Sequence, residues 1–485
     1  MFVFQENELE RILDIIITNM TPQRSPSQKP VPANILFLSA RYAHYHASPE
    51  LLETLLVAAM NKINEVVERY QWDMTVLAFW MSNATLLSHY LKKDPGVMKA
   101  TTDFQLQMAE LINEIFILII RDAERRMDKT LDQAMLDHEP LPGFEDVQFK
   151  SDWGNIFRSK PKAAPLEPME KRFRPPSPKR RAQPSPRNVT SLLSSTLFVL
   201  DLYDVHSVIT AQILSQLIYW LSAEVFNRIM SNRRFLCRTK AMQIRMNVST
   251  LEDWARSNNR QPEHFENGSM TSTGENTVDS TKRHLEPLVQ LLQWLQCFSS
   301  MGEDLESLVG TLQQLTRLSP QQLLHINKWY KTEVGEKGLS KSALKYIVHL
   351  QKATAERKGA RARSPNPQAK PSDAPPTTPV KPTSQDFSSP SPAPSRPSEE
   401  DEKEEAPDEM LLDPSYMLPF SLPTSTDMLI SYGAGFGGLN RERERKYIPT
   451  VPPEFLAKLD LNGGNKNNGS SYYEDAQWNN DRSYG

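Results

Sequence analysis

The sequence predicts an all-α fold, and two features of the chain support this prediction. The segment 209–229 carries apolar residues at every fourth position, and further apolar residues widen this stripe until little of the surface is polar. A helix of that kind packs inside a bundle of other helices. Helix-start signals also recur, as at Ser48-Pro49, where a capping serine stands before a proline in the first turn.

The central segment, 188–254, organises the rest of the chain. The apolar positions of its main helix are Ile209, Ile213, Leu217, Leu221, Val225 and Ile229, widened by Leu214, Ile218, Trp220 and Phe226. A basic stretch follows, and Ser249 with Glu252 three residues later has the spacing of a capping box. This spacing predicts that a new helix begins at Ser249.

Other helical patterns flank this core, and a different pattern closes the chain. Ser319-Pro320-Gln321-Gln322 combines a serine cap, a proline in the first turn and a glutamine at the third helical position, which predicts another helix start. From 410 to 461 the chain is apolar without a helical period, and its proline spacing forbids a long helix. We therefore expect an extended strap that docks on the helical body.

Composition divides the chain into six segments. They are an N-terminal helical subdomain (1–157), a basic proline-rich disordered insertion (158–187), a helical core (188–355), a proline-rich and acidic disordered insertion (356–409), the extended C-terminal strap (410–461) and a polar disordered tail (462–485).

The overall composition restricts the class of protein. The 37 prolines cluster, so the 485 residues hold less folded mass than their number suggests, and the net charge of −3 does not point to nucleic acid. Two cysteines suggest a reducing compartment, the first residues lack a secretory signal, and apolar runs such as 115–120 are shorter than the roughly 18 residues of a membrane span. We expect a soluble intracellular protein without a transmembrane segment.

The two insertions carry opposite charge. Residues 158–187 hold ten basic residues against two glutamates, which fits a solvated linker, a nuclear import signal or a contact with an anionic surface. The candidate import residues are Lys171, Arg172, Arg174, Lys179, Arg180 and Arg181. Candidate phosphorylation sites, each followed by proline, are Ser177, Ser185, Ser364, Thr378, Ser389 and Ser391. The acidic run 399–405 either stays solvated or folds back on the basic insertion.

No arrangement of residues predicts catalysis. A phosphate-binding GxxxxGK[ST] loop is missing, and the glycines of 433–438 lack the strand and helix of a nucleotide site. His44 and His46 have no third ligand at metal spacing, and Cys237 has no histidine base nearby. We expect a protein that is not an enzyme and binds no metal or cofactor.

Several segments resemble the Dilute domain, the cargo-binding globular tail of class V myosins. They are QILSQLIYWLSAEVFNR (212–228), MQIRMN (242–247), LEDWAR (251–256), LEPLVQ (285–290) and LSPQQ (318–322), with weaker matches at 35–37, 79–83, 411–413 and 419–420. The resemblance implies an elongated body of two abutting helical bundles, with the strap running back over the N-terminal one. It also implies docking of organelle receptors, Rab-type GTPases or cytoskeletal adaptors.

No motor, lever or heptad repeat precedes these segments, so the chain is more similar to motor-less fungal Dilute-domain proteins than to myosins. We therefore expect a non-enzymatic adaptor in vesicle or organelle traffic or actin-linked organisation, which is cytoplasmic and reaches Golgi or vesicle membranes through its partners. A nuclear or phospho-regulated scaffold addressed by the basic insertion is the alternative. The candidate contacts for acidic partner segments or phosphopeptides are Arg233, Arg234, Arg238, Lys240 and Arg245, which could equally brace helix ends.

Overall fold

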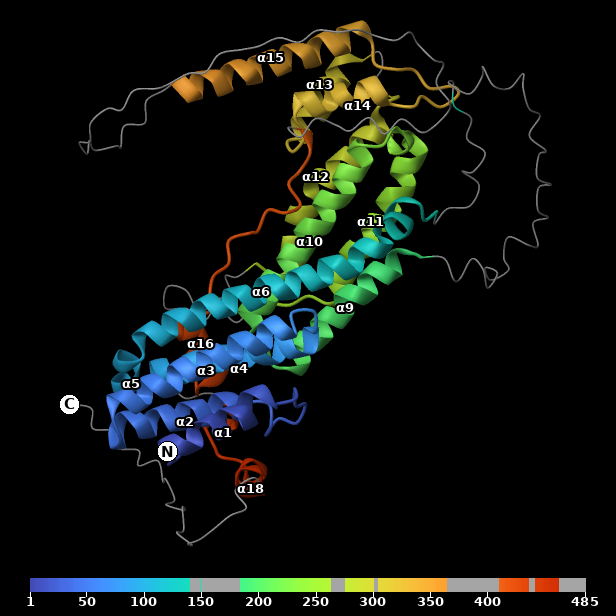
Figure 1. Ribbon diagram of the computed structural model, residues 1–485. Helices are drawn as coiled ribbons and strands as arrows, with labels where there is room; N and C mark the ends of the chain where they lie inside the picture. Colours follow the sequence, from blue (N-terminus) through green and yellow to red (C-terminus); the bar gives the residue numbers. More distant parts are fainter. Residues whose placement is uncertain are drawn as a thin grey trace, which may run out of the picture.

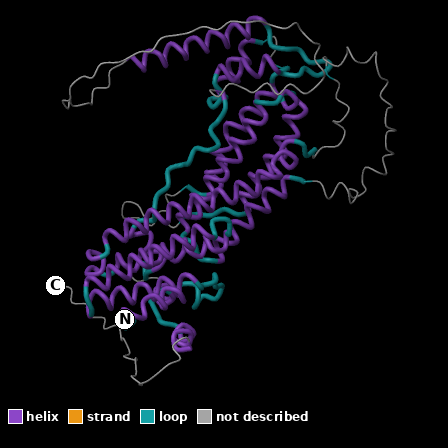
Figure 2. Tube along the Cα trace, in the orientation of Figure 1, coloured by secondary structure: helices purple, strands orange, loops and turns teal. Residues whose placement is uncertain are grey.

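The protein is an elongated helical body in the computed structural model, which describes residues 1–139, 149, 184–262, 275–300, 304–363, 410–435 and 441–461 (Figure 1). The described residues form helices joined by loops and no β-strand, with one isolated bridge between Phe149 and Glu333 (Figure 2). Buried apolar side chains from the whole length of the body form one cluster. The predicted all-α, elongated fold is therefore confirmed.

The first half of the body is built around α4 (Met74–Lys93), whose side chains are buried on nearly every face. Asp73 caps this helix by accepting hydrogen bonds from the N–H groups of Thr75 and Val76. Ser48 caps α3 in the predicted way. The other elements of this half are η1 (Glu6–Glu8), α1 (Leu9–Leu13), η2 (Asp14–Thr18), α2 (Val31–His46), α3 (Pro49–Arg69), α5 (Pro95–Ala100), α6 (Thr102–Leu131) and η3 (Asp132–Leu136).

The second half is built around α10 (Ser207–Met230), and all ten of its predicted core residues are buried. The helix α12 (Thr277–Cys297) packs against both α10 and α11 (Arg238–Ser257), and α6 crosses over from the first half to pack on α10. The remaining elements here are α9 (Pro186–Leu202) and η5 (Arg233–Phe235). The start of α9 lies inside the segment predicted to be a disordered insertion, so that insertion ends earlier than expected.

The expectation that no apolar run is long enough to cross a membrane is wrong for α10. By length and composition this helix could span a bilayer, but 72% of its apolar window lies buried inside the protein. Its hydrophobicity is therefore accounted for by the other helices that cover it.

The predicted helix start at Ser249 is also wrong, because Ser249 lies in the interior of α11. Buried residues continue the apolar stripe of the helix through this point: Ile244 and Val248 precede the serine, and Leu251 follows it. The Ser249 hydroxyl donates to the backbone oxygen of Met246 at 2.7 Å, a contact available inside a helix. Packing on both sides thus keeps the helix continuous where the local spacing alone suggested a break.

Three further elements lie at the far end of the second half. They are α13 (Leu305–Gln314), α14 (Pro320–Trp329) and α15 (Lys341–Arg363), which Figure 1 shows extending away from the body. The capping box of α14 is confirmed: the Gln322 N–H donates to Ser319 Oγ at 3.1 Å, and the Ser319 N–H donates to Gln322 Oε1 at 2.8 Å. Helix α15 continues past the predicted boundary at 355 to Arg363, and the first proline to follow that boundary is Pro365.

The C-terminal strap is extended in its first part only. Residues 410–424 form no helix beyond one isolated turn and run along α10 from α14 toward the first half (Figure 1). Beyond them the chain forms three short helices that the sequence did not predict: α16 (Ser425–Tyr432), α17 (Arg441–Lys446) and α18 (Pro453–Leu461). Each of these helices fits between successive prolines or glycines of the strap. These residues therefore limit the length of the helices but do not prevent them from forming.

The end of the strap packs on the N-terminal half, as the resemblance implied. Helix α16 contacts α4 and α18 contacts η2. The ring of Phe455 lies edge-on to that of Phe2, with 5.5 Å between centroids. Asp204, in the turn between α9 and α10, accepts from Lys29 at 3.0 Å and from Lys446 at 3.4 Å, so three distant parts of the chain meet there.

Candidate functional site

The candidate site is the face of α10 that binds the extended part of the strap through side-chain hydrogen bonds. Three amide side chains on this largely apolar helix, Gln212, Gln216 and Asn227, each bind the strap backbone by one donated and one accepted hydrogen bond; we call them the amide ladder. An amide on an apolar helix is costly unless both of its ends are bonded. Here the strap backbone satisfies both ends.

The amide ladder imitates the edge of a β-sheet. Asn227 donates to the oxygen of Leu412 at 2.7 Å and accepts from its N–H at 2.8 Å, and Gln212 pairs in the same way with Ser421 at 2.8 Å in both directions. Such an exchange with both groups of one residue is the pattern of an antiparallel pair.

Gln216 makes the other pattern. It donates to the oxygen of Tyr416 at 3.0 Å and accepts from the N–H of Leu418 at 2.8 Å, so it binds residues on either side of Met417 as a parallel neighbour strand would. Two further side chains complete the contact: Tyr219 donates to the Asp413 oxygen and Gln322 to the Met410 oxygen. The strap is therefore held mainly through its backbone.

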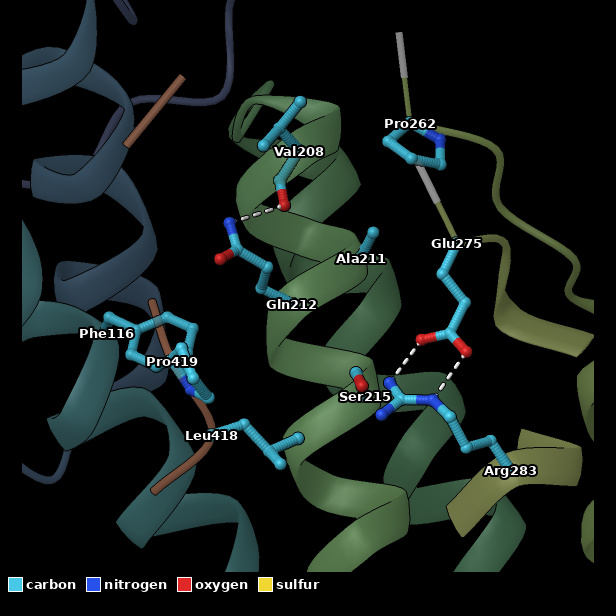
Figure 3. Close-up of a pocket in the computed structure, with 10 residues that line it drawn as sticks. All are labelled: Phe116, Val208, Ala211, Gln212, Ser215, Pro262, Glu275, Arg283, Leu418 and Pro419. Atoms are coloured by element: carbon cyan, nitrogen blue, oxygen red, sulfur yellow. Dashed lines mark hydrogen bonds and ion pairs between the residues drawn. The ribbon is translucent and has the colours of Figure 1, made fainter. Parts of the chain in front are cut away.

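Three cavities surround Leu418 of the strap. Their volumes are about 260, 530 and 260 Å³, and they lie between the strap, α10 and the neighbouring helices α6 and α12. Figure 3 shows the first of them, in which the Leu418 side chain points from the strap toward α10 and Arg283 is ion-paired with Glu275. The strap thus leaves space on both of its sides.

An aromatic pair anchors the strap to α6. The rings of Phe116 and Phe420 stack with their centroids 4.2 Å apart and their planes 28° apart. Phe116 is buried and lines two of the cavities beside Leu418, so its ring forms a shared wall. Stacking of this kind stabilises by about 0.5–1.5 kcal/mol beyond the area it buries.

A buried histidine supports the same face of α10 from α12. His284 Nε2 lies 2.9 Å from Ser215 Oγ, which accepts a hydrogen bond from Ser280 at 2.8 Å. Burial, with a smaller effect of Arg283, lowers the pKa of His284 to about 4. The imidazole is therefore neutral at pH 7 and can serve as a hydrogen-bond partner of Ser215.

The five basic residues predicted to contact partners follow α10 in the chain, on η5 and α11. Three of them form ion pairs inside the protein: Arg234 with Asp137 at 3.0 Å, Lys240 with Glu139 at 2.7 Å, and Arg245 with Glu252 at 3.2 Å. Arg233 lies over the Trp329 ring, 5.8 Å from its centroid. Arg238, at the first position of α11, is exposed and makes no ion pair with the described residues.

The predicted import signal and most predicted phosphorylation sites lie outside the described residues. They are Lys171, Arg172, Arg174, Lys179, Arg180 and Arg181, and Ser177, Ser364, Thr378, Ser389 and Ser391. Ser185 is described and is the N-cap of α9, where its N–H donates to Asn188 Oδ1 at 2.9 Å. Because an N-cap precedes the positive end of the helix dipole, a phosphate there would be favoured electrostatically.

The described residues offer little of what enzyme chemistry needs. Among them no three His, Cys, Asp or Glu side chains come together as a metal site. Burial raises the pKa of the Cys237 thiol to about 11, which makes it a poor nucleophile at neutral pH. Gly433 ends α16, and a Cβ there would come within 2.7 Å of the Leu429 oxygen, so close backbone packing explains this glycine.

The sequence prediction missed the amide ladder. It anticipated that the strap would dock but placed the function on the basic residues after α10. The available signal was the presence of the amides Gln212, Gln216 and Asn227 within a helix that is apolar around most of its surface. A buried amide such as that of Gln216 requires a hydrogen-bonding partner, and an extended segment elsewhere in the chain can supply it.

Comparison with solved structures places this architecture in a known class. A myosin V cargo-binding domain superposes with a TM-score of 0.52 at 16% identity, covering 74% of this chain and 85% of that one. The globular tail of Myo2, solved in complex with Mmr1, gives 0.51 at 16% identity, with coverages of 76% and 88%. The fold is that of the myosin V cargo-binding tails, which bind partner proteins.

Sequence comparison agrees with this assignment. Residues 212–334 match the family model of the DIL domain. A Dilute domain-containing protein of Schizosaccharomyces pombe is 29% identical over 95% of this chain and 73% of its own length. One of Saccharomyces cerevisiae is 22% identical over 71% of this chain and 52% of its own. Chicken unconventional myosin-Va is 24% identical over 61% of this chain, but the match spans only 15% of the myosin.

Proposed function

We propose that this protein is a non-enzymatic adaptor that binds organelle receptors, Rab-type GTPases or cytoskeletal adaptors and acts in vesicle or organelle traffic. The observation that carries the proposal is the cargo-tail fold over about three quarters of the chain together with the DIL match. Related support comes from Myo2, whose tail has been solved in complex with Mmr1, with Smy1 and with Inp2. Partners of that kind would bring a cytoplasmic protein to Golgi or vesicle membranes.

Arg238 is the basic residue best placed to test this function. It is exposed and makes no ion pair with a described residue, whereas Lys240 and Arg245 hold internal carboxylates. We expect Arg238→Glu to reduce capture of partners from the native cell, quantified by proximity labelling of the full chain, by roughly tenfold. The melting temperature should change little, because no internal contact is lost.

Arg256→Glu is the matched control, since Arg256 is exposed in the last turn of the same helix and pairs only with Asp253 among the described residues. The control should keep its partners. Equal capture by the wild type and Arg238→Glu would remove Arg238 as a contact. Failure of the wild type to enrich any trafficking protein over the control labelling would contradict the adaptor function itself.

A second candidate function is that of a nuclear scaffold, favoured by the density of basic residues in KRFRPPSPKRR (171–181). The replacement of Lys179, Arg180 and Arg181 by alanine tests it by fluorescence imaging in the native cell. Loss of a nuclear signal would support this candidate, and an unchanged distribution would exclude the segment as an import signal.

A further inference from the structure

The extended part of the strap has two backbone edges, and only one of them is hydrogen-bonded to the residues that the structure describes. The groups of Leu412, Tyr416, Leu418 and Ser421 face α10 and bind the amide ladder. In an extended chain the N–H and C=O groups of neighbouring residues point to opposite sides. The pattern shifts by one residue between Leu418 and Ser421, so Met417 faces outward before the shift, and Phe420 and Leu422 face outward after it. Within the described part of the chain, the N–H and C=O groups of Met417, and likewise those of Phe420 and Leu422, make no hydrogen bond.

This outer edge borders an apolar groove. The cavity of about 530 Å³ between the strap and α6 is lined on the helix side by Ala109, Asn113, Phe116 and Ile117, and on the strap side by Met417, Leu418, Phe420 and Leu422. Leu106, one turn earlier on α6, is 64% exposed and extends the apolar surface. A bare backbone edge beside exposed apolar side chains is a template for pairing with another extended chain.

One charge distinguishes the groove. Glu110 is the only charged residue among the described residues that line it, and Glu114 follows one turn later on the exposed side of α6. The other exposed polar residues on this stretch of α6, Gln107 and Asn113, carry no charge. An occupant with a lysine or arginine near its end would therefore be favoured over an acidic one.

We propose that this groove binds an extended segment of a partner protein by strand addition to the outer edge of the strap. The segment carries apolar side chains at alternate positions, which enter the groove, and a basic residue that pairs with Glu110. An extended occupant is favoured over a helical one because a helix has already used its own backbone groups and cannot pair with Met417 or Leu422. This inference rests on the proposed adaptor function and specifies one binding mode for it.

The test is a selection of random peptides of about seven residues, the length of a short strand, on the full chain. Peptides that also bind the Met417→Pro variant are removed in a subtractive step. This substitution deletes an N–H that has no partner among the described residues, and proline is compatible with the extended backbone there. We expect enrichment of peptides with alternating apolar residues and a terminal basic residue. Their affinity should fall roughly tenfold or more on Met417→Pro, the equivalent of one or two backbone hydrogen bonds.

Two further arms keep the result interpretable if Met417→Pro alters the strap. N-methylation of alternate peptide amides should abolish binding to the unmodified protein, since it removes the pairing hydrogens. Glu110→Lys should weaken the basic peptides and strengthen otherwise identical peptides with glutamate at the basic position. Gln107→Lys, a matched change on the same helix but outside the groove lining, should act much more weakly.

Several outcomes would overturn the inference. They are no enrichment over the variant, enrichment of peptides with helical rather than alternating spacing, or indifference to N-methylation. Binding of a synthetic peptide of residues 158–187, lost on Met417→Pro, would assign the groove to the chain's own insertion instead. A native partner that binds wild type and Met417→Pro equally would refute this binding mode and leave the adaptor function standing.

Discussion

Gln216 shows how one side chain can direct a segment two hundred positions away in the chain. Its amide would be costly on an apolar helix, but its two hydrogen bonds to Tyr416 and Leu418 remove that cost and set the register of the strap. Leu418 then reaches the cavities beside α10. The residue is therefore a positional signal: shifting the strap by one residue would present the wrong backbone groups to it.

His284 gives a prediction about pH. Its pKa in the folded protein is about 4, below the ordinary 6.5, mainly because of burial. The unfolded chain therefore binds a proton between these values that the folded protein does not. The free energy of unfolding should fall as the pH drops through this window, by up to about 1.4 kcal/mol per pH unit for each such histidine. His89, also buried, has a pKa of about 4 and adds to the loss.

The variant His284→Gln isolates this contribution. In urea unfolding at pH 7 and near pH 4.5, the advantage of the wild type over the variant should shrink as the pH falls. Exposed His46→Gln should give a curve parallel to that of the wild type. Burial raises the pKa of Glu124 to about 7, so this residue lowers the free energy of unfolding as the pH rises. Because Glu124 is present in all three proteins, its effect cancels when their curves are compared. A constant difference between wild type and His284→Gln would contradict the buried, neutral imidazole.

At the scale of single elements, Ser249 and Ser319 have the same sequence spacing but different roles. Ser319 accepts from the Gln322 N–H at the start of α14, whereas Ser249 lies inside α11. We expect Ser319→Ala to cost about 1 kcal/mol of unfolding free energy and Ser249→Ala to be neutral or slightly stabilising. Chemical denaturation of both variants checks this. A loss at Ser249 equal to that at Ser319 would mean that a helix does begin there.

These two serines also mark what could be predicted from sequence. The buried face of α10 followed from its own periodicity, and the α14 start from four adjacent residues, because both signals are local. The continuity of α11 depends on which neighbours bury Val248 and Leu251, which no local pattern contains. The amide ladder depends on the pairing of α10 with a strap about two hundred residues later. Such a contact leaves only the faint signal of polar residues on an apolar helix.

At the scale of the whole molecule, the strap joins the two halves. Its first residue, Met410, is bonded to Gln322 of α14, and the strap then follows α10. Further along, Phe420 stacks on Phe116 of α6, and the helices at its end pack on α4 and η2. Arg228 adds a second tie, donating to Asp132 of η3 at 2.7 Å and to Glu224 of its own helix at 3.1 Å. The surface offered to partners is therefore formed jointly by distant parts of one chain, and it should be lost if the strap is released.

Amide hydrogen exchange of the full chain, resolved to single residues, tests the central claim that one edge of the strap is bound to α10 while the other is open. The account predicts slow exchange for the N–H groups of Leu412, Leu418 and Ser421, which donate to the amide ladder. It predicts fast exchange for Met417 and Leu422, a few residues away. Uniformly fast exchange from 410 to 424 would show that the strap is not held on α10, and protection of Met417 and Leu422 would show that the outer edge is already occupied.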